Sequence, residues 1–337
     1  MLNFAIFDHL DSDGNPLGRF FENRLRLLEL IEQSGFHSYH LAEHHSTPLG
    51  MAASPSVFLA AAIQRTSKIK IGPLVYVLPL HHPLRLYEEI CMLDNLSGGR
   101  LTVGVGRGGA LIEHQRLGVD PKMAPAMYHE AFNILMHAFE VDVVDFEGHF
   151  YNYKDYVVQM KPLQRPHPPI WYGAPNAEAV TWAAPRGINV VSLGPGARAR
   201  AISERYREEW QRLGRDGKAL PSIGITRHIV VADSDDEAQA IANAAYPRWH
   251  DAIDYLWRRS NADFVLKEIY PRDFAALERI GHGVAGSPVT VREYLAGLHA
   301  ETGVNTVLCQ MVFGDMSFEA AARSIRLFGR EVMPAFS

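Results

Sequence analysis

The most constraining feature of this sequence is a regular alternation of short apolar segments with amphipathic ones. Eight segments have the apolar and β-branched composition of strands, and a helical pattern follows each of them. Strands that alternate with helices pair in parallel, because each helix carries the chain back across the sheet. Eight such strands can close into a ring, and 337 residues suffice for a barrel with insertions. The sequence therefore predicts an α/β protein, a (β/α)8 TIM barrel.

The expected strands are short and end in glycine, proline or polar residues. We place them at 2–7, 37–42, 69–78, 101–105, 169–173, 189–193, 223–231 and 304–311. Helix signals such as Pro55 and Pro83 at first positions and Gly35 after a last turn delimit the helices between them. We expect helices at 20–34, 55–63, 83–96, 121–140, 176–186, 197–213, 235–257, 290–302 and 317–332.

Two stretches interrupt the alternation, one after the fourth strand and one after the seventh. Residues 143–160 contain Phe-Glu-Gly-His-Phe at 146–150, so we expect a β-hairpin there. Residues 258–287 are irregular, rich in Arg and Lys, and carry three glycines near their end. A lid that closes over the barrel and a disordered surface insertion both fit this composition. No break in composition suggests a linker, so we expect a single domain, 1–337.

Charge and cysteine content argue against several classes of protein. A net charge of −5 and a pI near 6.3 are the opposite of the basic face that binds nucleic acid. Two cysteines are too few for a secreted disulfide framework. Residues 1–8 lack a basic leader, and no run approaches the ~20 apolar residues of a membrane span. We therefore expect a cytoplasmic protein that binds neither nucleic acid nor a membrane.

Three titratable side chains, Glu43, His44 and His45, follow the second expected strand. TIM barrels carry their chemistry at the carboxyl ends of the strands. Imidazole can take up and return a proton near neutral pH, because its ordinary pKa is about 6.5. An isolated pair of histidines is more often a surface or structural feature, but the later strand ends carry functional-looking residues too. We therefore predict His44 and His45 as catalytic candidates.

The fourth expected strand ends in Gly-Val-Gly-Arg-Gly-Gly at 104–109. The G-x-G-x-x-G fingerprint of dinucleotide binding follows the first strand of its unit, so this one, after the fourth strand, is a weak match. A phosphate site fits better, because glycines let the backbone approach an anion and Arg107 offers a bidentate fork. Asn176, the expected N-cap after the fifth strand, would aim free amides at the same anion. The alternative is a structural arginine that pairs with a carboxylate.

The end of the third strand is also rich in histidine, at Leu80-His81-His82-Pro83, and this raises the possibility of a metal site. A barrel metallohydrolase collects ligands from the late strands as well. Here the fifth, sixth and eighth strands end in Gly-Ala, Ser-Leu and Gln-Met, at 173–174, 192–193 and 310–311. We therefore predict no metal.

Several longer motifs lie along almost the whole chain. They are Glu43-His44-His45, Ala53-Ser54-Pro55, Val77-Leu78-Pro79 with His82-Pro83, Leu93-Asp94 with Ser97-Gly98-Gly99-Arg100, Gly104-Val105-Gly106-Arg107-Gly108, Gly286-Ser287-Pro288, and Phe328 with Glu331-Val332-Met333-Pro334. Together they resemble the bacterial-luciferase-like flavin-dependent monooxygenases, most closely the alkanal monooxygenase branch. The first 110 residues carry the most specific part of the resemblance.

The resemblance implies an enzyme and a reaction. The expected fold is a TIM barrel that binds reduced FMN (FMNH2) at the carboxyl ends of its strands. The expected activity uses O2 and a flavin C4a-peroxide to insert one oxygen atom into a small apolar organic substrate, such as an aldehyde or a terpenoid. A separate flavin reductase would supply the FMNH2, and the helices after strands two and three would form a homodimer.

The resemblance also assigns roles by position. His44 is the catalytic imidazole, and we expect His45 to be a structural donor beside it, bound to Glu43 or to a partner subunit. Arg107 and the amides after Asn176 would hold the phosphate, and the bond between Leu74 and Val75 would be a non-proline cis peptide. The full set of expected cofactor contacts is Leu74, Val75, Gly106, Arg107, Gly108, Ala174, Asn176, Ala177 and Ser192.

Two departures from the family pattern stand in this sequence. Gly106 occupies the position of a reactive cysteine in luciferases, which argues against light emission. The turn at 173–176 lacks the Glu-Ser pair of luciferase, so the phosphate contacts would fall to backbone, Arg107 and Asn176. Two other functions remain open: a deazaflavin-dependent hydride transferase that needs no oxygen, and a flavin-binding protein without turnover.

Overall fold

The structure, a computed structural model, describes residues 2–337. Its strands belong either to one large parallel sheet or to a small hairpin. The sheet contains β1 (Asn3–Asp8), β2 (Ser38–Leu41), β3 (Lys70–Pro73), β4 (Tyr76–Val77), β5 (Val103–Gly106), β8 (Ile170–Gly173), β9 (Asn189–Ser192), β10 (Ile223–Val231), β11 (Gly283–Gly286) and β12 (Thr306–Gln310). The antiparallel hairpin is β6 (Val143–Glu147) and β7 (Asn152–Val157), within the insertion expected at 143–160.

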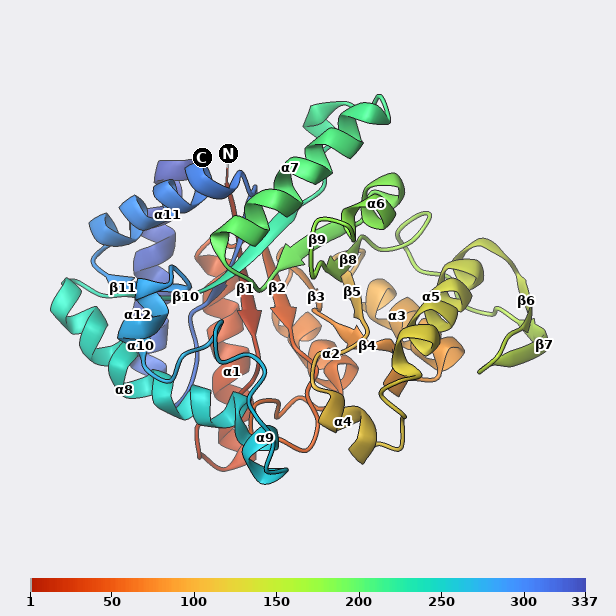
Figure 1. The fold of residues 1–337 in the computed structure, drawn as a ribbon, viewed down its shortest axis with the longest axis horizontal. Coiled ribbons are helices and arrows are strands. Elements are labelled where there is room, and N and C mark those ends of the chain that lie inside the picture. Colours follow the sequence, from red (N-terminus) through yellow and green to blue (C-terminus); the bar gives the residue numbers. More distant parts are fainter. Residues whose placement is uncertain (1) are drawn as a thin grey trace.

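The helices surround the sheet (Figure 1). They are α1 (Leu17–Gln33), α2 (Pro55–Arg65), α3 (Pro83–Leu96), α4 (Leu111–Arg116), α5 (Ala124–Glu140), α6 (Val180–Ala183), α7 (Gly196–Arg212), α8 (Asp235–Ile253), α9 (Tyr255–Arg259), α10 (Phe274–Arg279), α11 (Pro288–Thr302) and α12 (Phe318–Leu327). Proline opens α2, α3 and α11, where its missing N–H costs no helical hydrogen bond. Within residues 2–337, no helix combines the length and the apolar character that crossing a membrane requires.

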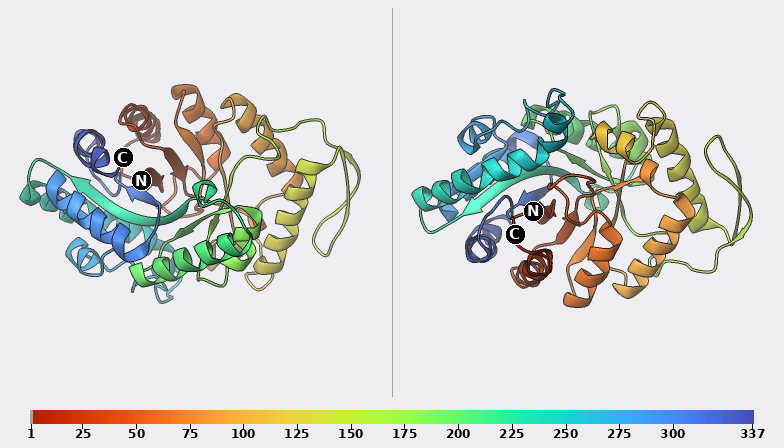
Figure 2. Two further views of the ribbon diagram at one scale, coloured as in Figure 1. Left: turned by 90° about the horizontal axis from the view of Figure 1, so that it is seen from above. Right: turned by 90° about the horizontal axis from the view of Figure 1, so that it is seen from below.

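The strands form a nearly closed barrel. Their order is β3-β2-β1-β12-β10-β9-β8-β5-β4, and β11 adds to β10 outside this ring. A parallel bridge between Ile71 and Leu101 links β3 to the residue pair before β5 and brings the two ends together. Figure 2 shows this ring of strands inside a ring of helices from both ends. The expected TIM barrel, with insertions after its fourth and seventh strands, is confirmed.

The third barrel strand is split into β3 and β4. The peptide bond between Leu74 and Val75 lies at the split and is cis, as the resemblance implies. Glycines of β5 make room for this irregular segment. A Cβ atom added to Gly104 would lie 2.4 Å from the carbonyl oxygen of Pro73, and one added to Gly106 would lie 2.5 Å from Cγ2 of Val75. Part of the glycine-rich sequence of β5 therefore serves packing.

Alternate residues of the strands face two different cores. One set packs against the helices, as Phe4 and Ile6 of β1 do. The other set fills the barrel interior, as is usual for a barrel of this size. The interior cluster consists of Ala5, Phe7, Ala42, Leu74, Trp171, Val191 and Leu308. The barrel is thus plugged, and room for chemistry exists only at its ends.

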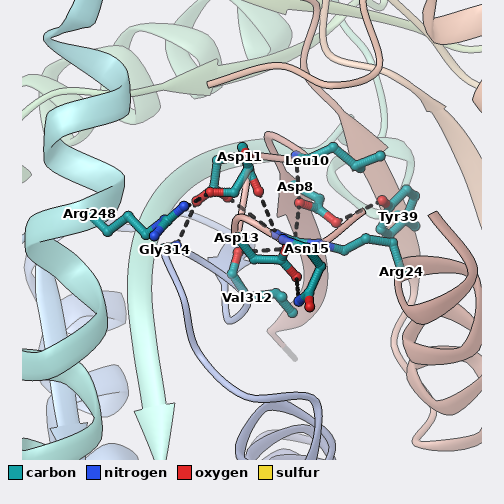
Figure 3. Close-up of polar contacts among 11 residues, drawn as sticks. Asp8, Leu10, Asp11, Asp13, Asn15, Arg24, Tyr39, Arg248, Val312 and Gly314 are labelled. Carbon is teal, nitrogen blue, oxygen red and sulfur yellow. Dashed lines mark hydrogen bonds and ion pairs between the residues drawn. The ribbon is translucent and has the colours of Figure 1, made fainter. Parts of the chain in front are cut away.

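A buried ionic cluster fixes the loop that follows β1 (Figure 3). Arg24 of α1 places its guanidinium 3.1 Å from a carboxylate oxygen of Asp8 and 3.4 Å from one of Asp11. The Tyr39 hydroxyl donates to Asp8 over 2.9 Å, and the Gly314 amide donates to Asp11 over 2.6 Å. Burial raises the pKa of Asp11 to about 7, although Arg24 acts in the opposite direction. This cluster ties the loop after the first strand to the loop after the last.

Several expected helices differ from those observed, and three of them have a clear local cause. The helix expected at 121–140 begins at Ala124, because Asp120 accepts the amide of Lys122 in a turn. The helix expected at 176–186 is reduced to α6 and a 3-10 turn that contains Pro185, whose missing N–H removes an α-helical hydrogen bond. The helix expected at 235–257 is divided at Asp254 into α8 and α9. The short helix α4 was not expected at all, since six residues show no clear period.

The stretch 258–287 is not an irregular or disordered insertion. It contains the end of α9, α10 and β11, and β11 pairs in parallel with β10. Phe274 and Leu277 of α10 are fully buried against α8. Upstream, Leu256 and Trp257 pack on Ala110, next to α4. The stretch is therefore a folded layer over one edge of the barrel.

Candidate active site

The carboxyl ends of the strands lie at the end of the barrel that carries α4 and α9, opposite the two chain termini (Figure 1). His44 lies at this end, three residues beyond β2, with its side chain 25% exposed. Its Nδ1 atom is 3.0 Å from a carboxylate oxygen of Glu113, a buried residue of α4. A hydrogen bond from Nδ1–H to a carboxylate fixes the tautomer and the ring plane of an imidazole. Nε2 of His44 then remains available to exchange a proton.

A second histidine, His9, stacks on His44. Their ring centroids are 5.6 Å apart and nearly parallel, and His9 follows the first barrel strand directly. Burial lowers the pKa of His9 well below its ordinary value, and the neighbouring His44 and His228 lower it further. His9 is therefore a neutral imidazole at neutral pH. The rule that placed His44 at a strand end applies equally to His9, which the sequence analysis did not select.

Glu43 organises a separate network behind His44. Its buried carboxylate accepts hydrogen bonds from His45 over 2.8 Å, from His81 over 2.9 Å and from the Val77 amide over 3.0 Å. Burial alone would raise the pKa of Glu43, but the bonds from His45 and His81 outweigh it and hold the pKa below its ordinary value. The same bond to Glu43 raises the pKa of His45. The expected bond between His45 and Glu43 is present, and the bond from the Val77 amide to Glu43 ties the end of β2 to the end of β4.

Arg107 follows β5 directly and is exposed. Within residues 2–337 its guanidinium forms no ion pair, so the alternative of a structural arginine bound to a carboxylate is wrong. The Arg107 carbonyl oxygen accepts a hydrogen bond from Nε2 of His114 over 2.8 Å. Because Glu113 bonds to His44 and its neighbour His114 bonds to Arg107, α4 connects the candidate imidazole and the candidate phosphate ligand.

The segment after β8 offers backbone more than side chain. Asn176 is exposed, and its side-chain oxygen accepts the amide of Ala179 over 3.1 Å. It therefore stabilises a turn before α6 and is not the N-cap of that helix, which begins at Val180. The Ala174 amide already donates to Val191 over 2.9 Å. Ala177 and the exposed amide edge of this turn remain as possible ligand contacts.

The other expected cofactor residues have clear structural roles. Ser192 is buried at the end of β9, and its hydroxyl accepts the Gly194 amide over 3.2 Å. Gly108 has a φ of +86°, and a Cβ there would lie 2.7 Å from both His114 and Val77. Gly106 has no space for a side chain beside Val75. This explains in packing terms why a cysteine does not fit at that position of this chain.

Glu113, His81 and His9 complete the site, and the sequence analysis did not assign them a role. His9 and His81 carry a usable signal, because they lie next to strand ends. Glu113 carries none, since it lies on a short helix and reaches His44 only through the fold. Within residues 2–337, no group of three or more His, Cys, Asp and Glu side chains is arranged to hold a metal ion.

The sequence is similar to those of known flavin-dependent monooxygenases. Residues 2–306 match the sequence profile of the family described as luciferase-like monooxygenase. The chain belongs to the luciferase-like monooxygenase family. It is 39% identical to an uncharacterised protein, y4wF, of Sinorhizobium fredii, over 98% of this chain and 96% of that one. It is 27% identical to the oxygenase component of the flavin-dependent trigonelline monooxygenase of Acinetobacter baylyi, over 100% and 96% of the two chains.

Solved structures of luciferase-like monooxygenases and their relatives have the same fold. The monooxygenase RslO1 of Streptomyces bottropensis superposes with a TM-score of 0.86 and 25% identity, over all of both chains. The oxygenating constituent of 3,6-diketocamphane monooxygenase from Pseudomonas putida, solved with FMN, superposes with a TM-score of 0.80 and 21% identity over 99% and 98%. A coenzyme F420-dependent reductase of Methanopyrus kandleri reaches 0.70 and 21% over 100% and 99%. The expected enzyme class, a flavin-dependent monooxygenase, is confirmed by the family, whereas the fold is shared with enzymes that use F420.

Proposed function

We propose that this chain is the oxygenase component of a two-component system, which takes FMNH2 from a separate reductase and inserts one atom of O2 into a small apolar organic substrate. One observation carries the proposal. α4 holds the His44 imidazole and the backbone of Arg107 at the same rim of the barrel, through Glu113 to His44 and through His114 to the Arg107 carbonyl oxygen. Such a rim suits a flavin, because Arg107 can bind the phosphate while His44 exchanges protons beside the ring.

The residues present fit FMN. Arg107 supplies a fixed positive charge for the phosphate, and the turn around Asn176 and Ala177 adds exposed amides. Gly106 and the segment of Leu74 and Val75 present backbone and small side chains, against which a flat ring can lie. Bound FMNH2 would supply the electrons that activate O2. His44 would hold or return a proton at Nε2, with its ring oriented by Glu113.

We propose that the stretch 258–287, together with the preceding α9, closes the barrel mouth during turnover. Water must be kept away from activated oxygen chemistry, and closing segments are the usual means. Leu256 and Trp257 of α9 already pack on Ala110, beside the helix that carries Glu113. Movement of this layer would therefore expose or cover His44. In this proposal the chain works as one domain, with the hairpin at 143–160 outside the site.

A homodimer through α2 and α3 fits the apolar residues that these helices expose. Val57, Met92 and Leu96 are 72%, 52% and 51% exposed. Exposed apolar side chains gathered on neighbouring helices mark an association surface. A cytoplasmic location stays a prediction.

Oxygenation of a substrate separates the proposed function from its main alternative, because free reduced FMN consumes O2 even without protein. The purified chain with chemically reduced FMN should consume O2 and oxygenate an added apolar substrate, whereas reduced F420 under anaerobic conditions should give no hydride transfer. Replacing Arg107 removes a charge-assisted contact, so Arg107→Ala should weaken FMN binding by roughly 10- to 100-fold. Lys122→Ala, at another exposed cation, is the matched control. Hydride transfer from reduced F420, or unchanged FMN affinity in Arg107→Ala, would contradict the proposal.

A further inference from the structure

A group of aromatic and polar side chains beside His9 has no part in the proton-transfer network. It lies where β10, α8, the segment before α10 and the loop after β12 meet. Figure 1 shows α8 and α9 running along this side of the barrel. We name it the His228 cluster, and it consists of His228, Tyr246, Trp249, Tyr270, Gln310 and Phe313.

Aromatic rings surround His228 on several sides. Its ring centroid is 4.4 Å from that of Trp249, 5.1 Å from Phe313 and 5.3 Å from Tyr246, all in edge-to-face arrangements. Tyr270, from the segment before α10, lies 6.1 Å away. These buried side chains pack edge-to-face on one another, and a flat or compact apolar ring admitted among them would pack in the same way.

The same cluster holds an unusual concentration of unpaired polar atoms. Within residues 2–337, fourteen buried side-chain nitrogen and oxygen atoms lack a hydrogen-bond partner, and six of them belong to the His228 cluster. They include both ring nitrogens of His228 and both amide atoms of Gln310, residues that are 0% and 2% exposed. The Tyr270 hydroxyl is close enough to Gln310 to oppose the rise that burial causes in the Tyr270 pKa, but the two side chains form no hydrogen bond. Unpaired buried polar groups lower stability, so a region selected only for packing would carry apolar residues instead.

His228 and Gln310 point to the same place. They are direct partners in the parallel register of β10 and β12. Paired residues on neighbouring strands project to the same face of a sheet, so the imidazole and the carboxamide lie side by side. A neutral imidazole has one N–H, and a carboxamide has two. The pair can therefore donate two hydrogen bonds to a single acceptor oxygen.

The His228 cluster is continuous with the candidate catalytic residue. Trp249 contacts His228 on one side and His9 on the other, with 5.6 Å between the Trp249 and His9 centroids. His9 in turn stacks on His44. A ring held against Trp249 would thus be linked to His44 through two aromatic side chains, Trp249 and His9.

We propose that the His228 cluster binds the substrate, and that this substrate is an uncharged cyclic compound whose carbonyl oxygen accepts hydrogen bonds from His228 and Gln310. This inference rests on the proposed function, because it takes His44 as the reacting end of the site. Burial, with nearby His282 and Arg227, lowers the pKa of His228 to about 3, so the imidazole is neutral at neutral pH. The positive charge of Arg227 disfavours a cationic ligand. Tyr270 belongs to the folded stretch 258–287, whose movement would admit the ring.

Calorimetric titration of the FMN-loaded full chain tests this proposal without turnover. The probes are 1-tetralone and tetralin, which have the same rings but differ in the carbonyl oxygen. We expect 1-tetralone to bind at least tenfold more tightly than tetralin. Gln310→Leu and His228→Phe should each weaken 1-tetralone binding roughly three- to tenfold, the loss of one hydrogen bond, and leave tetralin unchanged. The control is His37→Gln. His37 precedes β2, at the end of the barrel away from His44, so this substitution should change the affinity for neither probe.

Two further measurements distinguish a binding role from a structural one. Gln310→Leu removes unpaired buried atoms, so we expect a higher midpoint of thermal unfolding together with weaker ketone binding. FMN affinity should be unchanged in Gln310→Leu and in His228→Phe. Equal affinity for the two probes, no saturable binding of 1-tetralone, or a loss of FMN affinity in Gln310→Leu would each overturn the proposal. If 1-tetralone binds as expected but FMNH2 and O2 give no oxygenation, the proposed function fails and the binding site stands.

Discussion

The histidines at the barrel mouth differ in charge because their surroundings differ. His9 and His228 are buried among rings and basic groups, and this lowers the pKa of each. His45 bonds to a carboxylate, and this raises its pKa. His9 and His228 are therefore neutral and shape the site, whereas the protonated form of His45 is stabilised. His44, partly exposed and oriented by Glu113, is placed to exchange protons.

At the scale of single residues, His44→Ala is the decisive substitution. We expect product formation in a single turnover to fall by about 100-fold or more, because the proton-transfer group is lost. FMN affinity, measured by quenching of flavin fluorescence, should change little, since Arg107 lies on another strand. Glu113→Gln should give a smaller loss, because it weakens only the orientation of the ring. His149→Ala, on the exposed hairpin, is the control, and unchanged turnover in His44→Ala would remove His44 from the mechanism.

Among the elements, β5 shows how one sequence motif can serve two purposes. Its glycines resemble a phosphate-binding loop, yet Gly104 and Gly106 are required because the split between β3 and β4 lies against them. Arg107, immediately afterwards, is exposed and forms no ion pair within residues 2–337. The strand is therefore fixed by packing up to Gly106 and free for ligand contact from Arg107 onward.

Glycine substitutions in and after β5 test this division. We expect Gly106→Ala to lower the free energy of unfolding by about 1–3 kcal/mol, because the new Cβ would overlap Val75. Gly109→Ala should be nearly neutral, since a Cβ there meets no atom within 4 Å. Urea denaturation of both variants and the parent chain measures the difference. Equal stability of the two variants would show that Val75 moves aside without cost.

At the scale of the whole molecule, the barrel closes by pairing its first strand with its last. β1 pairs with β12, so residues near the two ends of the chain lie side by side. The ionic cluster of Asp8, Asp11 and Arg24 secures this seam from the mouth side, because Asp11 also holds the Gly314 amide (Figure 3). One arginine faces two carboxylates, which leaves the second carboxylate poorly compensated.

The pH dependence of stability follows from that imbalance. Burial raises the pKa of Asp11 from 3.8 to about 7, so the folded chain binds one more proton than the unfolded chain between these values. Stability therefore falls as pH rises through this range. Asp11→Asn keeps an acceptor for Gly314 and should be more stable than the parent at pH 8 by about 1–3 kcal/mol, with a flatter profile. Thermal unfolding from pH 4 to pH 8 checks this, and parallel profiles would contradict it.

Much of the fold could be predicted from local patterns. Strand 223–231 and helix 83–96 were placed to the residue, because a continuous apolar run and a proline start are local signals. The short α4 and the folding of 258–287 could not be, because their stability comes from contacts with distant residues. The N-cap assigned to Asn176 was wrong, because the Asn176 side chain closes a turn before α6, which begins only at Val180.

The sequence by itself determined the barrel, its parallel order and the strand ends that carry His44 and Arg107, because alternation of strand and helix admits few topologies. Only the tertiary structure decided which partners those residues have. Glu113 bonds to His44 from 69 positions along the sequence, and Gln310 lies beside His228 because β12 pairs with β10. Such contacts join residues that no local period relates, so they exist only once the ring of strands has closed.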